Sequence, residues 1–298
     1  MYKTNINNKH KANNNSDECL GNLIHKIFKP LYYKDKQYIK QFIKSTNNNN
    51  LSASLHKIST LVTNVYKINQ YVPDENRQDF ITTKIINYLY QLPNSIISTE
   101  LDTNIRFVDI GGGNGNVLNQ LATILDIQKD KVICVETSSD WVEKYEYNNS
   151  NISYMFWDNT DLKIESNSVN CVLCMVSLHH MTDTTIHNIL KEIKRILKPE
   201  GILLIKEHDT NNISQKYIQW EHYLYHILDN AYKYEVINPQ IYLETAIDNF
   251  KSKEEWQTII ETIGELTWKE RTNRFLDGEF TTDPKNPTNL YWDIYINN

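Results

Sequence analysis

The sequence has 298 residues, of which 40% are hydrophobic, and a formal net charge of −6. This length allows one large domain or two smaller ones with a real core. No apolar run approaches 18 residues, which excludes a typical membrane-spanning helix, and no signal-peptide pattern opens the chain. We therefore expect a soluble, cytoplasmic protein with no membrane partner.

The charge is unevenly distributed along the chain. Residues 1–50 contain nine Lys and three Asp or Glu, so this stretch carries +6 and the remainder carries −12. A basic segment of this kind can bind RNA or an anionic surface, and it can equally be a solvated tail.

The cysteines give no metal-binding pattern. Cys171 and Cys174 have C-x-x-C spacing but lie in an apolar, strand-like run, where positions i and i+3 face opposite sides. No second pair completes a set of four ligands. We expect Cys19, Cys134, Cys171 and Cys174 to be reduced thiols, with no metal bound, in a cytosol-like compartment.

The first hundred residues predict a helical extension or cap (1–100). Residues 1–16 and 45–52 are rich in Asn and are expected to be disordered or loop. Apolar residues at helical spacing occur between 20 and 28, between 55 and 68 and between 81 and 89.

From residue 101 the pattern changes to alternating strands and helices, which predicts an α/β fold with a largely parallel sheet. The predicted strands are 105–110, 131–136, 152–156, 169–177 and 201–207. An aromatic-rich helical insert follows at about 212–248, and Ser252 to Glu255 forms a capping box before a helix that Gly264 ends. Two β-like runs, 266–275 and 290–296, close the domain 101–298.

The most informative motif is the run D-I-G-G-G-N-G at 109–115, which holds four of the eight glycines in the chain. Glycine permits positive φ and a close approach of a ligand to the backbone. Because this run follows a predicted strand and precedes a predicted helix, it indicates a nucleotide-cofactor site. Dinucleotide-binding domains share this signal.

Two acids sharpen the prediction. Glu136 ends the second predicted strand, about twenty residues after the last glycine, where an acid can accept hydrogen bonds from ribose hydroxyls. Asp158 follows the third strand in F-W-D, although W-D-N-T also fits an ordinary Asx turn.

With these motifs the chain resembles the class I S-adenosylmethionine-dependent methyltransferases with a type 11-like domain. The matching stretches are F-V-D-I-G-G-G-N-G, V-E-T, F-W-D, C-V-L-C-M-V-S-L-H-H-M and I-L-K-P-E-G-I-L-L-I-K-E-H-D. The resemblance implies a Rossmann-like, seven-stranded, mostly parallel sheet with helices on both faces. It also implies that residues 290–296 insert antiparallel beside the fifth strand.

The resemblance further implies S-adenosylmethionine as cofactor and assigns roles to residues. Asp109 and the glycine loop would hold the methionine portion, Glu136 the ribose, and Asp158 the adenine amino group, while Trp157 would cover the ring. Ser177 and Leu178 would line the sulfonium pocket. The expected cofactor-binding set is Asp109, Gly111, Gly113, Asn114, Gly115, Glu136, Thr137, Trp157, Asp158, Ser177 and Leu178.

Two positions depart from the family pattern. Asn170 stands where the family often has Asp, and Glu200 replaces a usual Gly in L-K-P-E-G. Both are expected to lie away from the cofactor.

Two histidines are candidate general bases. His208 follows the fifth strand, next to Glu207, and His180 follows the fourth. An imidazole titrates near neutral pH, so either could remove a proton from an acceptor, with His208 as the first choice. Such histidines also often cap helices, and an acceptor that is already nucleophilic needs no base.

The aromatic residues of the insert, Trp220, Tyr223 and Tyr225, predict a lid over an acceptor, and core packing or RNA stacking explains them equally. We expect a methyltransferase acting on a small molecule. The alternatives are an RNA or mRNA-cap methyltransferase, a non-catalytic partner subunit of the same fold, and, less well supported by the glycine spacing, a nicotinamide-dependent oxidoreductase. The oligomeric state is not evident from the sequence.

Overall fold

The computed structural model describes residues 76–91, 105–146, 151–211, 246–272 and 290–298, together with isolated positions at 56–63 and 218–238. The chain divides into two compact units. The first consists of residues 1–73, 213–246 and 282–287, and the second, which we call the sheet unit, consists of residues 74–212, 247–281 and 288–298. The elements described below all belong to the sheet unit.

A seven-stranded sheet forms the centre of this unit, in the order β3-β2-β1-β4-β5-β7-β6. The first five strands run parallel to their neighbours, and β7 lies antiparallel between β5 and β6. This is the mostly parallel sheet predicted from the sequence, including the antiparallel insertion of residues 290–296. The strands are β1 (Phe107–Ile110), β2 (Val132–Glu136), β3 (Ser153–Phe156), β4 (Val169–Met175), β5 (Leu197–His208), β6 (Thr267–Thr272) and β7 (Leu290–Ile296).

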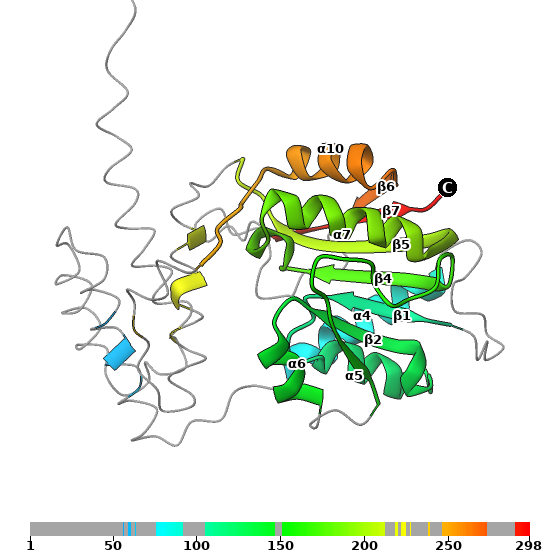
Figure 1. Ribbon diagram of the computed structural model, residues 1–298, viewed down its shortest axis with the longest axis horizontal. Helices are drawn as coiled ribbons and strands as arrows, with labels where there is room; N and C mark the ends of the chain where they lie inside the picture. The colour runs from blue at the N-terminus through cyan, green and yellow to red at the C-terminus, as the bar shows by residue number, and fades with distance from the viewer. Residues whose placement is uncertain are drawn as a thin grey trace, which may run out of the picture. The chain divides into compact units, whose positions relative to one another are not determined.

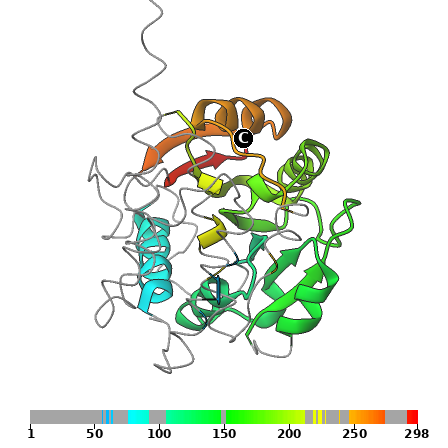
Figure 2. The same cartoon turned by 90° about the vertical axis from the view of Figure 1, so that its left-hand side faces the viewer.

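Helices cover both faces of the sheet. One apolar cluster joins the sheet to α7 (Asp183–Ile196) and α10 (Lys253–Ile263), and another joins the opposite face to α4 (Asn76–Gln91) and α5 (Asn116–Ile124). The remaining helix, α6 (Ser139–Glu146), packs against the second cluster through Val142 and Tyr145. Figure 1 shows α7 and α10 along one side of the strands, and the turned view places the cyan α4 and the light-green α7 on opposite sides (Figure 2).

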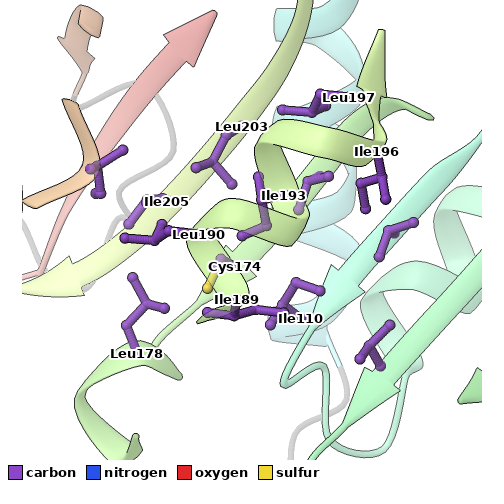
Figure 3. Packing of buried hydrophobic residues seen from close by; sticks show 14 of the residues in the cluster. Ile110, Cys174, Leu178, Ile189, Leu190, Ile193, Ile196, Leu197, Leu203 and Ile205 are labelled. Carbon is purple, nitrogen blue, oxygen red and sulfur yellow. The ribbon is translucent and has the colours of Figure 1, made fainter. Parts of the chain in front are cut away.

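A stripe of branched residues explains the packing of α7. Ile189, Leu190 and Ile193 point from α7 toward the sheet, where Leu203 and Ile205 of β5 lie in the same cluster (Figure 3). All five side chains are at most 1% exposed. Burial of each such side chain contributes about 1.5–3 kcal/mol, so this helix is fixed firmly against the strands whose ends carry the site.

The predicted boundaries of α10 are confirmed. Ser252 caps the helix, with its hydroxyl accepting the backbone N–H of Glu255, and the Glu255 carboxylate accepts the N–H of Ser252. Gly264 follows the last helical residue and forms the C-cap. Reciprocal satisfaction of the first orphan N–H groups fixes the start of such a helix.

The structure groups α4 with the sheet, whereas the sequence prediction places it in the N-terminal extension. Thr82 donates a hydrogen bond to the amide oxygen of Gln120 on α5 at 3.0 Å. Ile85 and Leu89 are fully buried in the cluster that contains β1 and α5. The apolar face of α4 packs against this core, so α4 is an integral layer of the sheet unit.

The two departures from the family pattern have local explanations. The amide oxygen of Asn170 accepts the backbone N–H of Arg106 at 3.1 Å and the Lys198 ammonium at 2.9 Å, so the amide replaces one function of a carboxylate. Glu200 adopts φ 64°, a left-handed conformation that glycine enters without strain. The cost of this conformation is borne near the start of β5, at the opposite end of the strand from the site.

The thiols described by the structure are free. Cys134, Cys171 and Cys174 are buried and unpaired with one another. Cys171 faces one apolar cluster and Cys174 the other, as expected for positions i and i+3 of a strand. Within the described ranges, no helix combines the length and the apolar character that a bilayer span requires.

Candidate functional site

A cleft of about 430 Å³ opens at the carboxyl ends of β1, β2 and β4. In open α/β sheets this edge is where ligands bind, and the volume lies in the range of cofactor sites. The lining residues are Gly111, Gly112, Gly113, Asn114, Glu136, Thr137, Ser138, Val176, Ser177, His180 and Met181. They form two walls, a glycine wall (111–114 with 136–138) and a histidine wall (176–181).

The glycine wall is a backbone bend between β1 and α5. Gly111 and Gly113 have φ of 69° and 58°. A Cβ atom at Gly111 would lie 2.6 Å from the Cβ of Ser177, and one at Gly112 would lie 2.6 Å from a carboxylate oxygen of Asp109. Conformation and space together therefore require glycine here, and the bend presents main chain to the cleft.

Glu136, the last residue of β2, braces this bend. Its carboxylate accepts the backbone N–H of Gly113 at 2.5 Å. Burial raises the pKa of Glu136, and hydrogen bonds from the N–H groups of Gly113 and Thr137 oppose this rise. An 8% exposed carboxylate at the cleft is suited to accept hydrogen bonds from a polar ligand.

Asp109 lies beneath the bend, outside the lining of the cleft. It is 1% exposed, and its Oδ1 has no hydrogen-bond partner among the described residues. Burial, followed by repulsion from Glu136, raises the pKa of Asp109 well above its usual range. Asp109 is therefore buried close to Gly112, and its contact with the methionine portion stays a prediction.

Three further predicted residues are packed in the interior. Gly115 begins α5 with φ 65° and leaves room for Tyr154 and Ile152. Trp157 and Leu178 are at most 2% exposed in the core. The indole N–H of Trp157 donates to the carbonyl of Thr160 at 2.5 Å. None of the three lines the cleft. The side chains of Trp157 and Leu178 pack in the core, and the missing side chain of Gly115 leaves space for its neighbours.

Asp158 forms the Asx turn that the sequence allowed as an alternative. Its Oδ1 accepts the backbone N–H of Thr160 at 3.1 Å and the Thr160 hydroxyl at 2.5 Å. These bonds hold the pKa of the exposed Asp158 below its usual range. The side chain does not belong to the lining residues, so its contact with an adenine amino group stays a prediction.

The histidine wall begins with a strained residue. Val176 has φ 56°, which is rare for a β-branched side chain, and its N–H donates to the carbonyl of Lys206 at 2.7 Å. Ser177 follows, with its hydroxyl donating to the carbonyl of Ile110 at 2.9 Å. Such strain persists only where surrounding contacts enforce it and often marks functional sites.

The structure places the two candidate bases in different surroundings. His180, at the end of the short 3-10 helix η3 (Leu178–His180), lines the cleft and is exposed. His208, at the end of β5, is 4% exposed and lies edge-on to the ring of His179 at 5.4 Å between centroids. His208 is therefore buried within the sheet unit and His180 lines the cleft, and a role as base stays a prediction for both.

The predicted lid is largely untested. Trp220 and Tyr225 lie outside the described residues, and Tyr223 is 5% exposed within the first unit. The remaining predicted residues of the cleft, Asn114 and Thr137, are exposed members of the lining.

Sequence reasoning missed Ser138, Val176 and Met181 as lining residues, and it included Gly112 only as part of the glycine loop. Gly112 and Ser138 adjoin predicted site residues, so continuity of the bend and of the strand end could have found them. The left-handed conformation of Val176 has no sequence signal, because it results from the contacts on either side.

Comparison with known families supports this reading of the fold and cleft. Residues 107–201 match the family model described as "Methyltransferase domain". No match was found among curated proteins.

Several solved structures are similar to this chain at low identity. A chain in the complex between the Haloferax volcanii Trm112 methyltransferase activator and a candidate methyltransferase is 18% identical, with 76% of this chain and 99% of that chain covered and a TM-score of 0.46. A SAM-dependent methyltransferase from Aquifex aeolicus is 13% identical, covering 80% and 97%, with a TM-score of 0.46. Geranyl diphosphate C-methyltransferase from Streptomyces coelicolor A3(2) is 10% identical, covering 72% and 77%, with a TM-score of 0.46.

These structural likenesses carry no information on the substrate of this chain. The family match covers the glycine bend, Glu136 and the histidine wall, which are the parts that form the cleft. Residues 107–201, about a third of the chain, are therefore similar to a methyltransferase domain.

Proposed function

We propose that the protein is an S-adenosylmethionine-dependent methyltransferase that acts on a small molecule. The observation that carries the proposal is the cleft of about 430 Å³, in which a glycine bend and the Glu136 carboxylate meet at the carboxyl edge of the sheet. Backbone that only glycine can form, next to a buried acid, suits a polar, hydroxyl-bearing ligand.

The residues present fit this cofactor. Gly111, Gly113 and Asn114 would hold the methionine end along the bend, while Glu136 and Thr137 would hold the ribose. S-adenosylmethionine supplies a reactive methyl group on a positively charged sulfur. The contribution of the protein is then to align the acceptor, exclude water and, where the acceptor requires it, remove a proton.

His180 is the proposed proton acceptor. It lines the cleft and has the chemistry of a base near neutral pH, whereas His208 is buried behind it in the sheet unit. The buried free thiols Cys134, Cys171 and Cys174 support the further proposal that the protein works in a reducing, cytosol-like compartment.

Two measurements test this function in order. Isothermal calorimetry of the full chain with S-adenosylmethionine should give saturable binding. Incubation with methyl-labelled cofactor and fractionated metabolites, RNA and protein should then place the label in the metabolite fraction. Absence of cofactor binding would overturn the proposal, and label confined to protein or RNA would overturn the small-molecule assignment.

RNA methylation is the second candidate, because residues 1–50 carry a charge of +6. Phosphate binding by Lys residues makes affinity fall steeply with salt. RNA affinity of the full chain that drops across a salt titration, together with label in the RNA fraction, would favour this candidate. Affinity that is independent of salt would count against it.

A further inference from the structure

A buried carboxylate and two imidazoles form a continuous hydrogen-bonded line that ends in the cleft. The Glu207 carboxylate lies 2.7 Å from Nδ1 of His179, and Nε2 of His179 lies 3.1 Å from Nε2 of His180. Glu207 and His179 are both fully buried, whereas His180 lines the cleft. The proposed base is thus connected to an acid on the neighbouring strand β5.

The hydrogen-bond partners determine where the protons lie in this line. Glu207 accepts the backbone N–H of Leu178 at 2.9 Å through one oxygen, and its other oxygen faces Nδ1 of His179. A carboxylate only accepts, so His179 carries its proton on Nδ1 and presents the lone pair of Nε2. His180 then donates from its own Nε2 to His179, and the atom of His180 that remains to gain a proton is Nδ1.

The surroundings are arranged to accept a protonated His180. Its Nδ1 lies 3.4 Å from the carbonyl oxygen of Ile247, so an added Nδ1–H group would meet an acceptor. Its Nε2–H group meets His179, behind which Glu207 supplies a negative charge. Both N–H groups of an imidazolium would therefore have acceptors, and the charge would have a counter-ion one ring away.

The line is also held rigidly. Phe250 stacks on His179 with 4.8 Å between ring centroids, and the backbone N–H of Asn249 donates to the carbonyl of His179 at 2.8 Å. Among the described residues of the sheet unit, the titratable groups packed around Glu207 and His179 include Cys174, His208 and Tyr291, and the pKa values of Cys174 and Tyr291 are raised chiefly by burial. Neither of these two groups supplies a compensating positive charge.

We propose that Glu207 and His179 are positioning residues that keep His180 ready to take a proton, and that the acceptor attacks through an oxygen or nitrogen atom that carries one. This inference rests on the proposed function. As the acceptor forms its bond to the methyl carbon and the carbon–sulfur bond breaks, the acceptor's O–H or N–H bond breaks and its proton passes to Nδ1 of His180. Charge is conserved, because the positive charge leaves the sulfur and appears on the imidazole.

The test is an NMR titration of the histidine side chains in the full-length protein without cofactor. Glu207→Gln keeps the size of the side chain and removes its charge, so the pKa of His180 should fall by about 0.5–1 unit. His180→Gln assigns the resonance. Glu165→Gln is the matched control, because it makes the same charge change on an exposed residue at the opposite end of the sheet and should leave the pKa of His180 in place.

A second measurement uses the unmodified protein, so it does not depend on whether a variant folds. Nitrogen chemical shifts should show His179 with its proton on Nδ1 and neutral His180 with its proton on Nε2. The opposite tautomer of His179, or an unchanged pKa of His180 in folded Glu207→Gln, would overturn the inference. Calorimetry with S-adenosylmethionine on the same samples separates the two proposals, because failure of cofactor binding rejects the function whatever the titration shows.

Once an acceptor is found, the rate profile should agree with the titration. The pH at which kcat rises to half its maximum should move down in Glu207→Gln by the same amount as the pKa of His180, with little change in the KM for the cofactor. A change confined to KM would show that Glu207 has only a structural role.

Discussion

The two walls of the cleft are built by different means. In the glycine wall, three glycines line the cleft, and the Glu136 carboxylate braces the bend by accepting the backbone N–H of Gly113. In the histidine wall, side chains from several elements converge, and the backbone at Val176 is strained. Added atoms should therefore disturb the glycine wall most, whereas removal of a hydrogen-bond partner should disturb the histidine wall most.

This difference separates binding from chemistry. A bend made of main chain offers a fixed shape that suits a cofactor common to a whole family. A line of titratable side chains offers a proton site whose strength depends on its neighbours, which suits the acceptor-specific step. The predictions below test each side of this contrast.

The largest effect is expected for Gly111→Ala in the glycine wall. The left-handed conformation costs about 1–2 kcal/mol for a residue with a Cβ atom, and the clash with Ser177 adds about 1–3 kcal/mol. Urea unfolding should therefore show a loss of about 2–5 kcal/mol in the free energy of unfolding, and cofactor binding should be abolished. The double variant Gly111→Ala with Ser177→Gly should recover the steric part only, and full recovery would show that conformation does not matter there.

Glu136→Ala should weaken cofactor binding by about 10- to 150-fold, because a charge-assisted hydrogen bond contributes about 1.5–3 kcal/mol. Since burial raises the pKa of Glu136, affinity should begin to fall on acidification at a higher pH than an ordinary glutamate predicts. Calorimetry across pH measures both effects. The same experiment on Asp158→Ala tests the remaining prediction for that residue, and unchanged affinity in Glu136→Ala would remove Glu136 from the site.

Asp109→Asn tests the support beneath the bend. The pKa of Asp109 is raised in the folded protein, so protonation favours folding at low pH, and this advantage is lost as pH rises from the ordinary aspartate value through the folded value. The Asn variant has no carboxyl group to ionise at this position, so its stability does not fall in this way as pH rises. Without cofactor it should be more stable than the parent by about 1–3 kcal/mol at neutral pH, with the gap closing toward pH 4. Thermal unfolding at several pH values measures this gap, and a gap that widens on acidification contradicts it.

The smallest effect is expected for Val176→Asn in the histidine wall. Asparagine enters the left-handed region more readily than valine, so the variant should gain about 1 kcal/mol of stability. The matched reverse change is Asn159→Val, at an exposed residue with φ 67°, which should lose a similar amount. Equal stability of parent and both variants would show that the backbone at these positions carries no strain.

Much of the fold follows from patterns that are local in the sequence. The glycine run, the capping box at Ser252 and the stripe on α7 each depend on neighbours a few residues away, and the structure contains all three. The insertion of residues 290–296 beside β5 is not local and came from the family resemblance.

The histidine wall could be predicted only in part, because its properties arise from contacts distant in sequence. His180 and His208 are both plausible bases by residue type, and only packing places one in the cleft and the other behind it. Glu207 contacts His179 although the two residues are 28 positions apart in the sequence. Trp157 is buried in the core, so its contact with the adenine ring stays a prediction.

The placement of β7 has a consequence for how the nascent chain matures on the ribosome. β7 pairs with β5 along seven residues from Ile202 to His208, and β6, which is translated earlier, pairs with β7. Until residues 290–296 emerge, β5 therefore exposes an apolar edge that another chain could pair with. Glu207 lies on that edge strand opposite Tyr291, so the carboxylate on which the imidazoles depend gains its β7 neighbour only after a strand translated well after β5 has emerged.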